Sequence, residues 1–190
     1  MIGAEPYLWT RTQYDRMTEI GLWGPEDRAE LVGGEILQLA PQDPEHACTV
    51  VVAGEIFRSA FGTDFHARTH CPLIIGSMSE PEPDIAVVQG DFRAYRREHP
   101  ATAALVLEVA RSSLDFDREV KSSLYASAIV DEYWIVNLVD RCLEVHREPI
   151  AMTSARFGYG YRSRQLFQPG DVIHPVAKSD ASIAVAELFS

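Results

Sequence analysis

The chain has 190 residues, the length of one domain, and it is long enough to bury a core of its own. Its 46% hydrophobic and 24% charged residues are typical of a globular protein, and no apolar run approaches the length of a membrane-spanning helix. The net charge of -11 argues against a protein that coats nucleic acid through a generally basic surface. The first residues, MIGAEPYLWT, lack the basic and apolar regions of a signal peptide, and the three scattered cysteines indicate free thiols. We therefore expect a cytoplasmic protein.

The first third of the chain predicts a helix, a hairpin and a longer helix. Thr10 can cap a short helix over residues 11–20. Strand-like runs at residues 29–32 and 35–39 flank two glycines, which is a signal for a two-residue hairpin turn. Asp43 and Pro44 then have the residue types of a helix cap and first helical position. The apolar face of this second helix is formed by Ala47, Val50, Val51, Gly54, Phe57 and Phe61.

The remaining segments alternate between strands and helices. Strand candidates lie at residues 65–75, 84–88, 104–110, 132–138 and 142–147, and aromatic residues alternate from Phe157 to Tyr161. A helix is expected from Asp115, with a buried stripe at Phe116, Val120, Leu124 and Ala128. Asp180 can cap a final short helix. We predict an α/β fold in one domain, with a central mixed β-sheet flanked by helices. Residues 1–27 form a lead-in with the hairpin after it, and residues 150–190 form C-terminal strands and a short helix.

Two apolar strands each carry one carboxylate. Asp84 stands directly before Ile-Ala-Val-Val, and Glu108 shares its face of the strand LVLEVA with Val106 and Ala110. Strands this apolar are normally covered on both faces, where an unpaired ionised acid is costly. If the two strands are neighbours, a cation is needed between the acids. It can be Mg²⁺, which suits paired carboxylates and water, or Lys121 on the following helix.

Each of these residues also has an ordinary explanation. Pro-Asp is common in turns, Glu108 can be a satisfied core acid, and Asp117 with Lys121 can be a surface ion pair at i, i+4. The order of strand acid, strand acid and helix lysine favours a site. His66, His70 and Cys71 would resemble a zinc site on a helix, but their segment has the pattern of a strand and lacks an evident fourth ligand.

The order of the acids and lysine, with the surrounding segments, resembles the Uma2 family, formerly DUF820. This family is a branch of the PD-(D/E)XK, restriction-endonuclease-like nucleases. The matching segments are ELVGGEI (30–36), PEHA (44–47), EPDIAVV (82–88), LVLEVARSSLDFDREVKSSLYA (105–126) and DEYWIVNL (131–138). They span residues 28–149, and the resemblance implies a restriction-endonuclease-like core there.

The resemblance also implies roles for individual residues. Asp84 and Glu108 would be metal ligands for Mg²⁺ or Mn²⁺, with the main-chain carbonyl of Val109 as a third. Lys121 would orient or activate the attacking water. The superfamily's lysine is expected two residues after the glutamate, where this chain has Ala110, so Lys121 would take its place.

Two further residues, Glu35 and His46, match positions often kept in the family, so we expect them to be accessory site residues. The implied function is a metal-dependent endonuclease that hydrolyses phosphodiester bonds of a nucleic acid, with DNA the first expectation. Arg111, Arg118 and the segment 93–97 are candidates for a basic rim. The acidic net charge keeps a non-catalytic module that binds nucleic acid or protein as the alternative. The sequence leaves open whether two copies form a homodimer.

Overall fold

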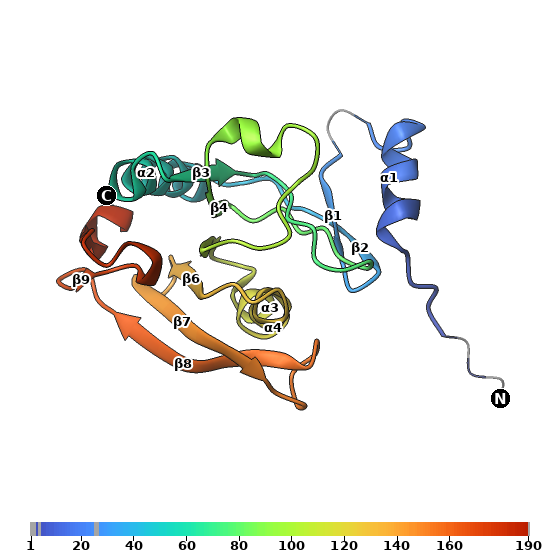
Figure 1. Ribbon diagram of the computed structural model, residues 1–190. Helices are drawn as coiled ribbons and strands as arrows, with labels where there is room; N and C mark the ends of the chain where they lie inside the picture. The colour runs from blue at the N-terminus through green and yellow to red at the C-terminus, as the bar shows by residue number, and fades with distance from the viewer. Residues whose placement is uncertain (1–2, 4, 25–26, 190) are drawn as a thin grey trace.

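A computed structural model describes residues 3, 5–24 and 27–189 of the chain. Its centre is a six-stranded sheet in the order β3-β4-β5-β6-β7-β8 (Figure 1). The strands are β3 (Phe65–Thr69), β4 (Ile85–Gln89), β5 (Leu105–Ala110), β6 (Glu132–Asn137), β7 (Cys142–Ala151) and β8 (Tyr159–Phe167). Strands β5 and β6 are parallel and the other neighbours are antiparallel. The predicted mixed sheet with flanking helices is therefore confirmed.

Helices cover both faces of this sheet. Helix α2 (Pro44–Phe61) lies on one face, where Phe57 packs its ring edge-on against Trp134 of β6 at 5.5 Å between centroids. The short elements β9 (Val172–Ile173), η3 (Val176–Lys178), β10 (Ile183–Ala184) and η4 (Val185–Phe189) belong to this side. The opposite face is covered by α3 (Leu114–Phe116), η2 (Asp117–Lys121) and α4 (Ser122–Ser127). No helix in the described ranges is both long and apolar enough to cross a bilayer.

The strand alternation places the acid of β5 on a defined face. Leu105, Leu107 and Val109 pack toward α2, while Val106 and Ala110 pack toward α4. Glu108 lies between the last two, so it points to the layer that carries η2. This confirms the alternation expected from the sequence.

The helix predicted from Asp115 has a more complex form than expected. Its middle, η2, is a π-helical turn in which the Ser122 amide donates to the Asp117 carbonyl five residues earlier. Of the predicted stripe only Leu124 is fully buried, while the other three residues are half-buried. The widened turn instead directs Asp117 and Lys121 inward, where they are 3% and 6% exposed. The expectation of one regular helix was wrong for this reason.

Two other boundaries differ from the sequence prediction. Strand β3 ends at Thr69 because His70 turns the chain with a φ of +47°. The expected C-terminal helix capped by Asp180 is replaced by β10 and the 3₁₀ turn η4.

The N-terminal elements form as predicted. Helix α1 (Arg11–Glu19) begins at Thr10, whose hydroxyl accepts from the Gln13 amide while the Gln13 side chain accepts from the Thr10 amide. Strands β1 (Ala29–Val32) and β2 (Glu35–Gln38) form the hairpin that the two glycines predict. Its β1 strand is joined to the body by a bridge between Leu31 and Glu80.

Replacing Gly34 by alanine should destabilise the fold. Gly34 has a φ of +85°, and a Cβ there would lie 2.8 Å from Leu8 Cβ and from Met78 Cε. We expect a loss of about 1–3 kcal/mol in the free energy of unfolding, measured by urea denaturation. Gly170→Ala is the control, because a Cβ at Gly170 meets nothing within 4 Å. Equal midpoints for the two variants would contradict this description of the hairpin.

His146 should make stability depend on pH. Its ring lies among Ser122, Tyr133 and Tyr161, and burial lowers the pKa of His146 to about 4. Between the ordinary pKa of about 6.5 and this value, the unfolded chain takes up a proton that the folded chain does not. The contribution of His146 to stability is therefore lost as the pH falls through this window, by about 3 kcal/mol.

Urea unfolding at about pH 7.5 and about pH 4.5 measures this dependence. On going from the higher to the lower pH, the stability of His146→Gln should fall less, or rise more, than that of the wild type. His174→Gln, at an exposed position, should follow the wild type. An unchanged difference in His146→Gln would show that the buried ring does not set the dependence.

Candidate functional site

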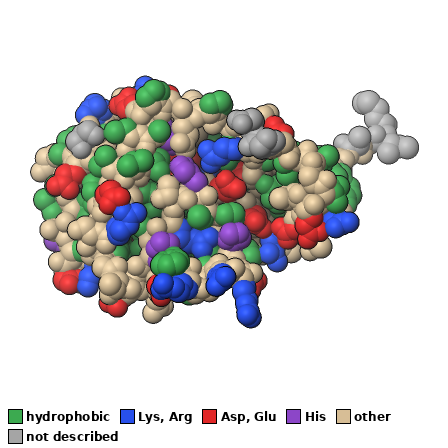
Figure 2. Space-filling model, turned by 90° about the horizontal axis from the view of Figure 1, so that it is seen from above, with side chains coloured by type: hydrophobic (Ala, Val, Ile, Leu, Met, Phe, Trp, Pro, Cys, Tyr) green, Lys and Arg blue, Asp and Glu red, His purple; other side chains and the backbone are tan. Residues whose placement is uncertain are grey.

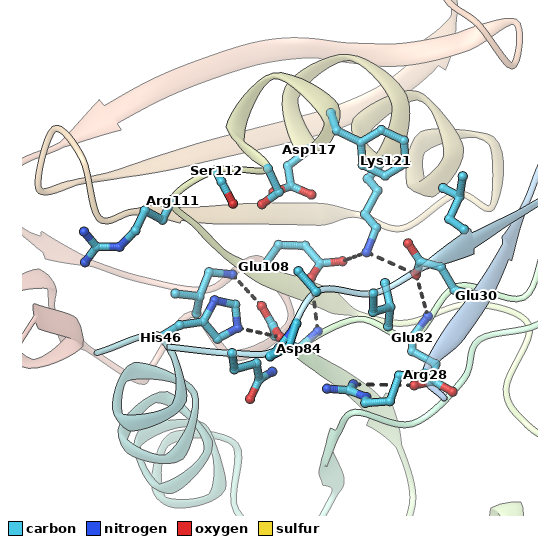
Figure 3. Close-up of a pocket in the computed structure, with 18 of the residues that line it drawn as sticks. Arg28, Glu30, His46, Glu82, Asp84, Glu108, Arg111, Ser112, Asp117 and Lys121 are labelled. Carbon is cyan, nitrogen blue, oxygen red and sulfur yellow. Dashed lines mark hydrogen bonds and ion pairs between the residues drawn. The ribbon is translucent and has the colours of Figure 1, made fainter. Parts of the chain in front are cut away.

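A cavity of about 410 Å³ lies between the hairpin, the start of α2 and the α3–η2 segment. Acidic side chains predominate among its charged residues: Glu30, Asp43, Glu82, Asp84, Glu108 and Asp117. Basic side chains reach it from Arg28, Arg111 and Lys121 (Figure 3). The cavity contains most of the residues that the sequence singled out.

The two strand acids lie side by side, as predicted. Antiparallel pairing of Ile85 with Leu107 brings Asp84 next to Glu108. The Asp84 amide donates to Glu108 Oε2 at 3.2 Å, and the Val109 amide donates to Asp84 Oδ2 at 2.8 Å. Their residues are 7% and 4% exposed. Main-chain donors thus fix both carboxylates at one place on the sheet.

Lys121 reaches the same place from η2. Its Nζ lies 2.9 Å from Glu108 Oε1 and 3.2 Å from Glu30 Oε2. Tyr125, one turn further along, donates its hydroxyl to Glu108 Oε1 at 2.7 Å. The sequence placed Lys121 on the helix that follows the Glu108 strand, and the π-helical turn buries it between the two carboxylates (Figure 3).

The site holds more negative charge than Lys121 can neutralise. Burial, assisted by the charges of Asp84 and Asp117, raises the pKa of Glu108 to about 8, although Lys121 opposes the shift. Burial likewise raises the pKa of Asp117 to about 6, against the effect of Lys121. Burial alone would lower the pKa of Lys121, but Glu108, Glu30 and Asp117 raise it, so the lysine stays cationic. A further cation would relieve this excess of carboxylates.

His46 lies at the site and contacts Asp84. Asp43 caps α2 by accepting the amides of Glu45 and His46, which places the His46 ring beside the sheet. Its Nε2 is 3.1 Å from Asp84 Oδ1. Burial alone would lower the pKa of His46, but Asp84 raises it. Burial would raise the pKa of Asp84, but His46 and the Val109 amide lower it.

The structure does not bring Glu35 to the cavity. Glu35 is exposed at the start of β2 and pairs with Arg156 at 2.6 Å. Glu30, in the same motif, occupies the site instead, being 1% exposed and accepting the Glu82 amide at 3.1 Å. Glu30 is buried because its strand, β1, packs against the body of the protein. Glu35 comes after the turn, on β2, and is exposed.

His70 also lies at the site, although the sequence suggested it only as a zinc ligand. Its Nδ1 lies 3.5 Å from Asp84 Oδ1, on the same oxygen that His46 contacts. The zinc hypothesis for His66, His70 and Cys71 gains no support. Within the described part of the chain, no three His, Cys, Asp or Glu side chains form a group that could hold a metal.

Asp84 and Glu108 with water nevertheless suit a hard cation. Mg²⁺ uses one or two protein carboxylates and keeps several waters, so it needs no closed protein cage. The Val109 amide points to Asp84, and in a strand the carbonyl of a residue points the same way as its amide. The donor set of Asp84, Glu108 and the Val109 carbonyl therefore fits Mg²⁺ or Mn²⁺, and not a closed zinc site.

The model of the Uma2 family, described as "Putative restriction endonuclease", matches residues 11–186. The chain belongs to the Uma2 family. A solved structure, described as a putative nuclease belonging to DUF820 from Anabaena variabilis ATCC 29413, is similar in fold with a TM-score of 0.66. It shares 15% sequence identity, over 90% of this chain and 94% of that one. No protein with a curated description matches the chain.

The Uma2 assignment confirms the family expected from the sequence motifs. In this Uma2 chain Ala110 is fully buried in the apolar core beside α4, and the lysine at the acids is Lys121. Of the predicted basic rim, Arg111 lines the cavity and pairs with Asp43 and Glu45. Arg118 pairs with the buried Glu144, outside the cavity lining.

Proposed function

We propose that this Uma2 protein is a metal-dependent endonuclease that hydrolyses phosphodiester bonds in nucleic acid, with DNA the first substrate to test. One observation carries the proposal: Asp84, at the start of β4, lies beside Glu108 of β5 in a cavity where Lys121 contacts Glu108. Oxygen ligands and a lysine at one point are the groups that phosphodiester hydrolysis needs. Membership in a family described as "Putative restriction endonuclease" supports the same chemistry.

The carboxylates of Asp84 and Glu108, with the Val109 carbonyl, would hold Mg²⁺ or Mn²⁺. Such an ion supplies polarisation of the phosphate and a lower pKa for bound water. Lys121 places a cationic donor 2.9 Å from Glu108, where it can orient the attacking water and offset negative charge on the phosphate. His46 holds the Asp84 carboxylate in one orientation through its contact with Oδ1.

Arg111 suits a contact with the substrate at the mouth of the cavity. Its side chain is 46% exposed and pairs with Asp43 and Glu45 at the start of α2. A phosphate of the substrate would compete with these carboxylates for the guanidinium group.

The test is incubation of the protein with supercoiled plasmid, single-stranded DNA and RNA. Cleavage is expected with Mg²⁺ or Mn²⁺ and should stop when EDTA is added. Cleavage that persists unchanged in EDTA would contradict a metal-dependent mechanism. Testing the three substrates side by side identifies which nucleic acid is cleaved.

A non-catalytic binding module remains the second candidate because of the contacts of the two acids. Asp84 Oδ1 contacts His46 and Oδ2 accepts the Val109 amide. Glu108 Oε1 accepts from Lys121 and Oε2 accepts the Asp84 amide. The site is thus hydrogen-bonded by the protein alone. This candidate predicts binding of nucleic acid without cleavage of any substrate under any metal condition.

A further inference from the structure

The edge strand β3 carries a row of basic side chains that leads to the site. Phe65 and Ala67 pack toward α2, so His66 and Arg68 of the same strand point to the opposite face, the face of Asp84. His70 lies at Asp84, and Arg68 lies about 7 Å further along the strand. This spacing is comparable to one nucleotide of an extended strand.

Arg68 is a buried cation without a carboxylate partner. It is 7% exposed, its Nη2 lies 2.8 Å from His99 Nδ1, and its guanidinium lies over the Tyr95 ring at 5.4 Å. Its Nε has no hydrogen-bond partner. Among residues 3, 5–24 and 27–189, no acid forms an ion pair with it. A buried charge without an opposite charge beside it is costly, and an anion such as a phosphate would stabilise the Arg68 guanidinium group.

His99 extends this cationic position to the surface. A guanidinium group only donates, so His99 Nδ1 must accept from Arg68, and the neutral ring then carries its proton on Nε2. Burial and the neighbouring Arg68 lower the pKa of His99, which favours this neutral form. The residue is exposed, so it offers a fixed N–H donor to solvent above Arg68.

The segment beside Arg68 combines cations with an exposed aromatic ring. It contains η1 (Phe92–Tyr95), in which the side chain of Phe92 is 59% exposed. The Phe92 ring lies against the ring of His66 and the guanidinium group of Arg93. Arg96 and Arg97 follow and are exposed. In Figure 2, which looks onto the side where Figure 1 has β3 and the η1 segment, basic and His side chains gather around a recessed area. Aromatic rings beside cations are how proteins bind single strands.

We propose that these residues, the β3 track of His66, Arg68, Arg93, Arg96, Arg97 and His99, bind a single nucleic-acid strand next to the cleavage site. Arg68 and His99 receive the phosphate beside the one that lies at Asp84, and Phe92 stacks on a base. This inference rests on the proposed function, since it takes the cleaved phosphate to lie at Asp84. It also explains how a chain of net charge -11 can hold a polyanion: the contact is local.

The test is fluorescence anisotropy with a labelled single-stranded oligonucleotide, in EDTA so that no cleavage occurs. The variants are Arg68→Gln, the double variant Arg96→Gln/Arg97→Gln, and the control Arg162→Gln. The control removes an exposed arginine of β8, which pairs with Glu148 of β7. We expect a Kd about fivefold or more higher for both track variants. The salt slope should fall by about 0.7 for each lost phosphate contact.

The double variant keeps the test decisive if Arg68→Gln fails to fold, because Arg96 and Arg97 are exposed. Wild-type affinity and salt slope in the track variants, or equal absence of binding in all proteins, would overturn the inference. The two proposals fail separately. Loss of binding in the track variants without cleavage by the wild type would sustain the track and contradict the nuclease. Cleavage by the wild type, together with unaltered binding by the track variants, would support the nuclease and contradict the track.

Discussion

Asp84→Asn is expected to lower metal-dependent cleavage by at least about 100-fold. The substitution keeps the size of the side chain and the oxygen that accepts the Val109 amide, but it removes the negative charge that would hold the cation. The fold should persist because the amide still occupies the same place between β4 and β5. The initial rate of plasmid nicking with Mn²⁺, together with the thermal midpoint, measures both expectations.

Glu35→Gln is the matched control for this experiment. It also removes one carboxylate charge from a residue of a family motif, but Glu35 is exposed and pairs with Arg156 away from the cavity. Its cleavage rate should stay within about twofold of the wild type. Full activity of Asp84→Asn, or an equal loss in both variants, would contradict the assignment of the site.

Lys121→Met is expected to have the largest effect on stability. Lys121 is the cation shared by Glu30 and Glu108, which are 1% and 4% exposed. Methionine keeps most of the apolar stem but leaves two buried carboxylates without their cation. Breaking a buried pair in this way costs about 3–5 kcal/mol, measured as the free energy of unfolding in urea. Cleavage should also be lost, because no lysine remains at the acids.

Two comparisons show whether this effect comes from the buried charges. Adding Glu108→Gln to Lys121→Met should recover part of the lost stability, since one of the unpaired carboxylates is then neutral. Lys178→Met breaks only the pair with Asp180, a residue whose side chain is 76% exposed, and should cost at most about 1 kcal/mol. If Lys121→Met is no more destabilising than Lys178→Met, the buried ion pairs do not contribute as described.

The elements that the sequence predicted well depend on local signals. The cap at Asp43, the capping residues of α1 and the Gly33-Gly34 turn each act within a few residues. The strands of Asp84 and Glu108 were recognised because apolar runs interrupted by one acid are unusual. That they are neighbours was a condition of the argument for a cation, and only the family resemblance implied it by making both acids ligands of one metal. The pairing of β4 with β5 places the two acids side by side.

The parts that were missed depend on contacts between distant segments. Glu30 and Glu35 stand in one motif, and only the packing of β1 against Glu80 and Glu82 decides which of them is buried. His70 reaches Asp84 through the register of β3 with β4 and a positive φ, neither of which has a local signature. The η2 turn, which directs Asp117 and Lys121 inward, likewise has no local signature, because its residues fit an ordinary helix equally well.

The proposed function depends on a cation site at Asp84 and Glu108. Isothermal titration calorimetry with Mn²⁺, on the wild type and on Asp84→Asn, tests it without reference to activity. We expect binding at one site in the wild type and its loss in the variant. Equal binding by the two proteins, or none by the wild type, would contradict a cation site at these two acids.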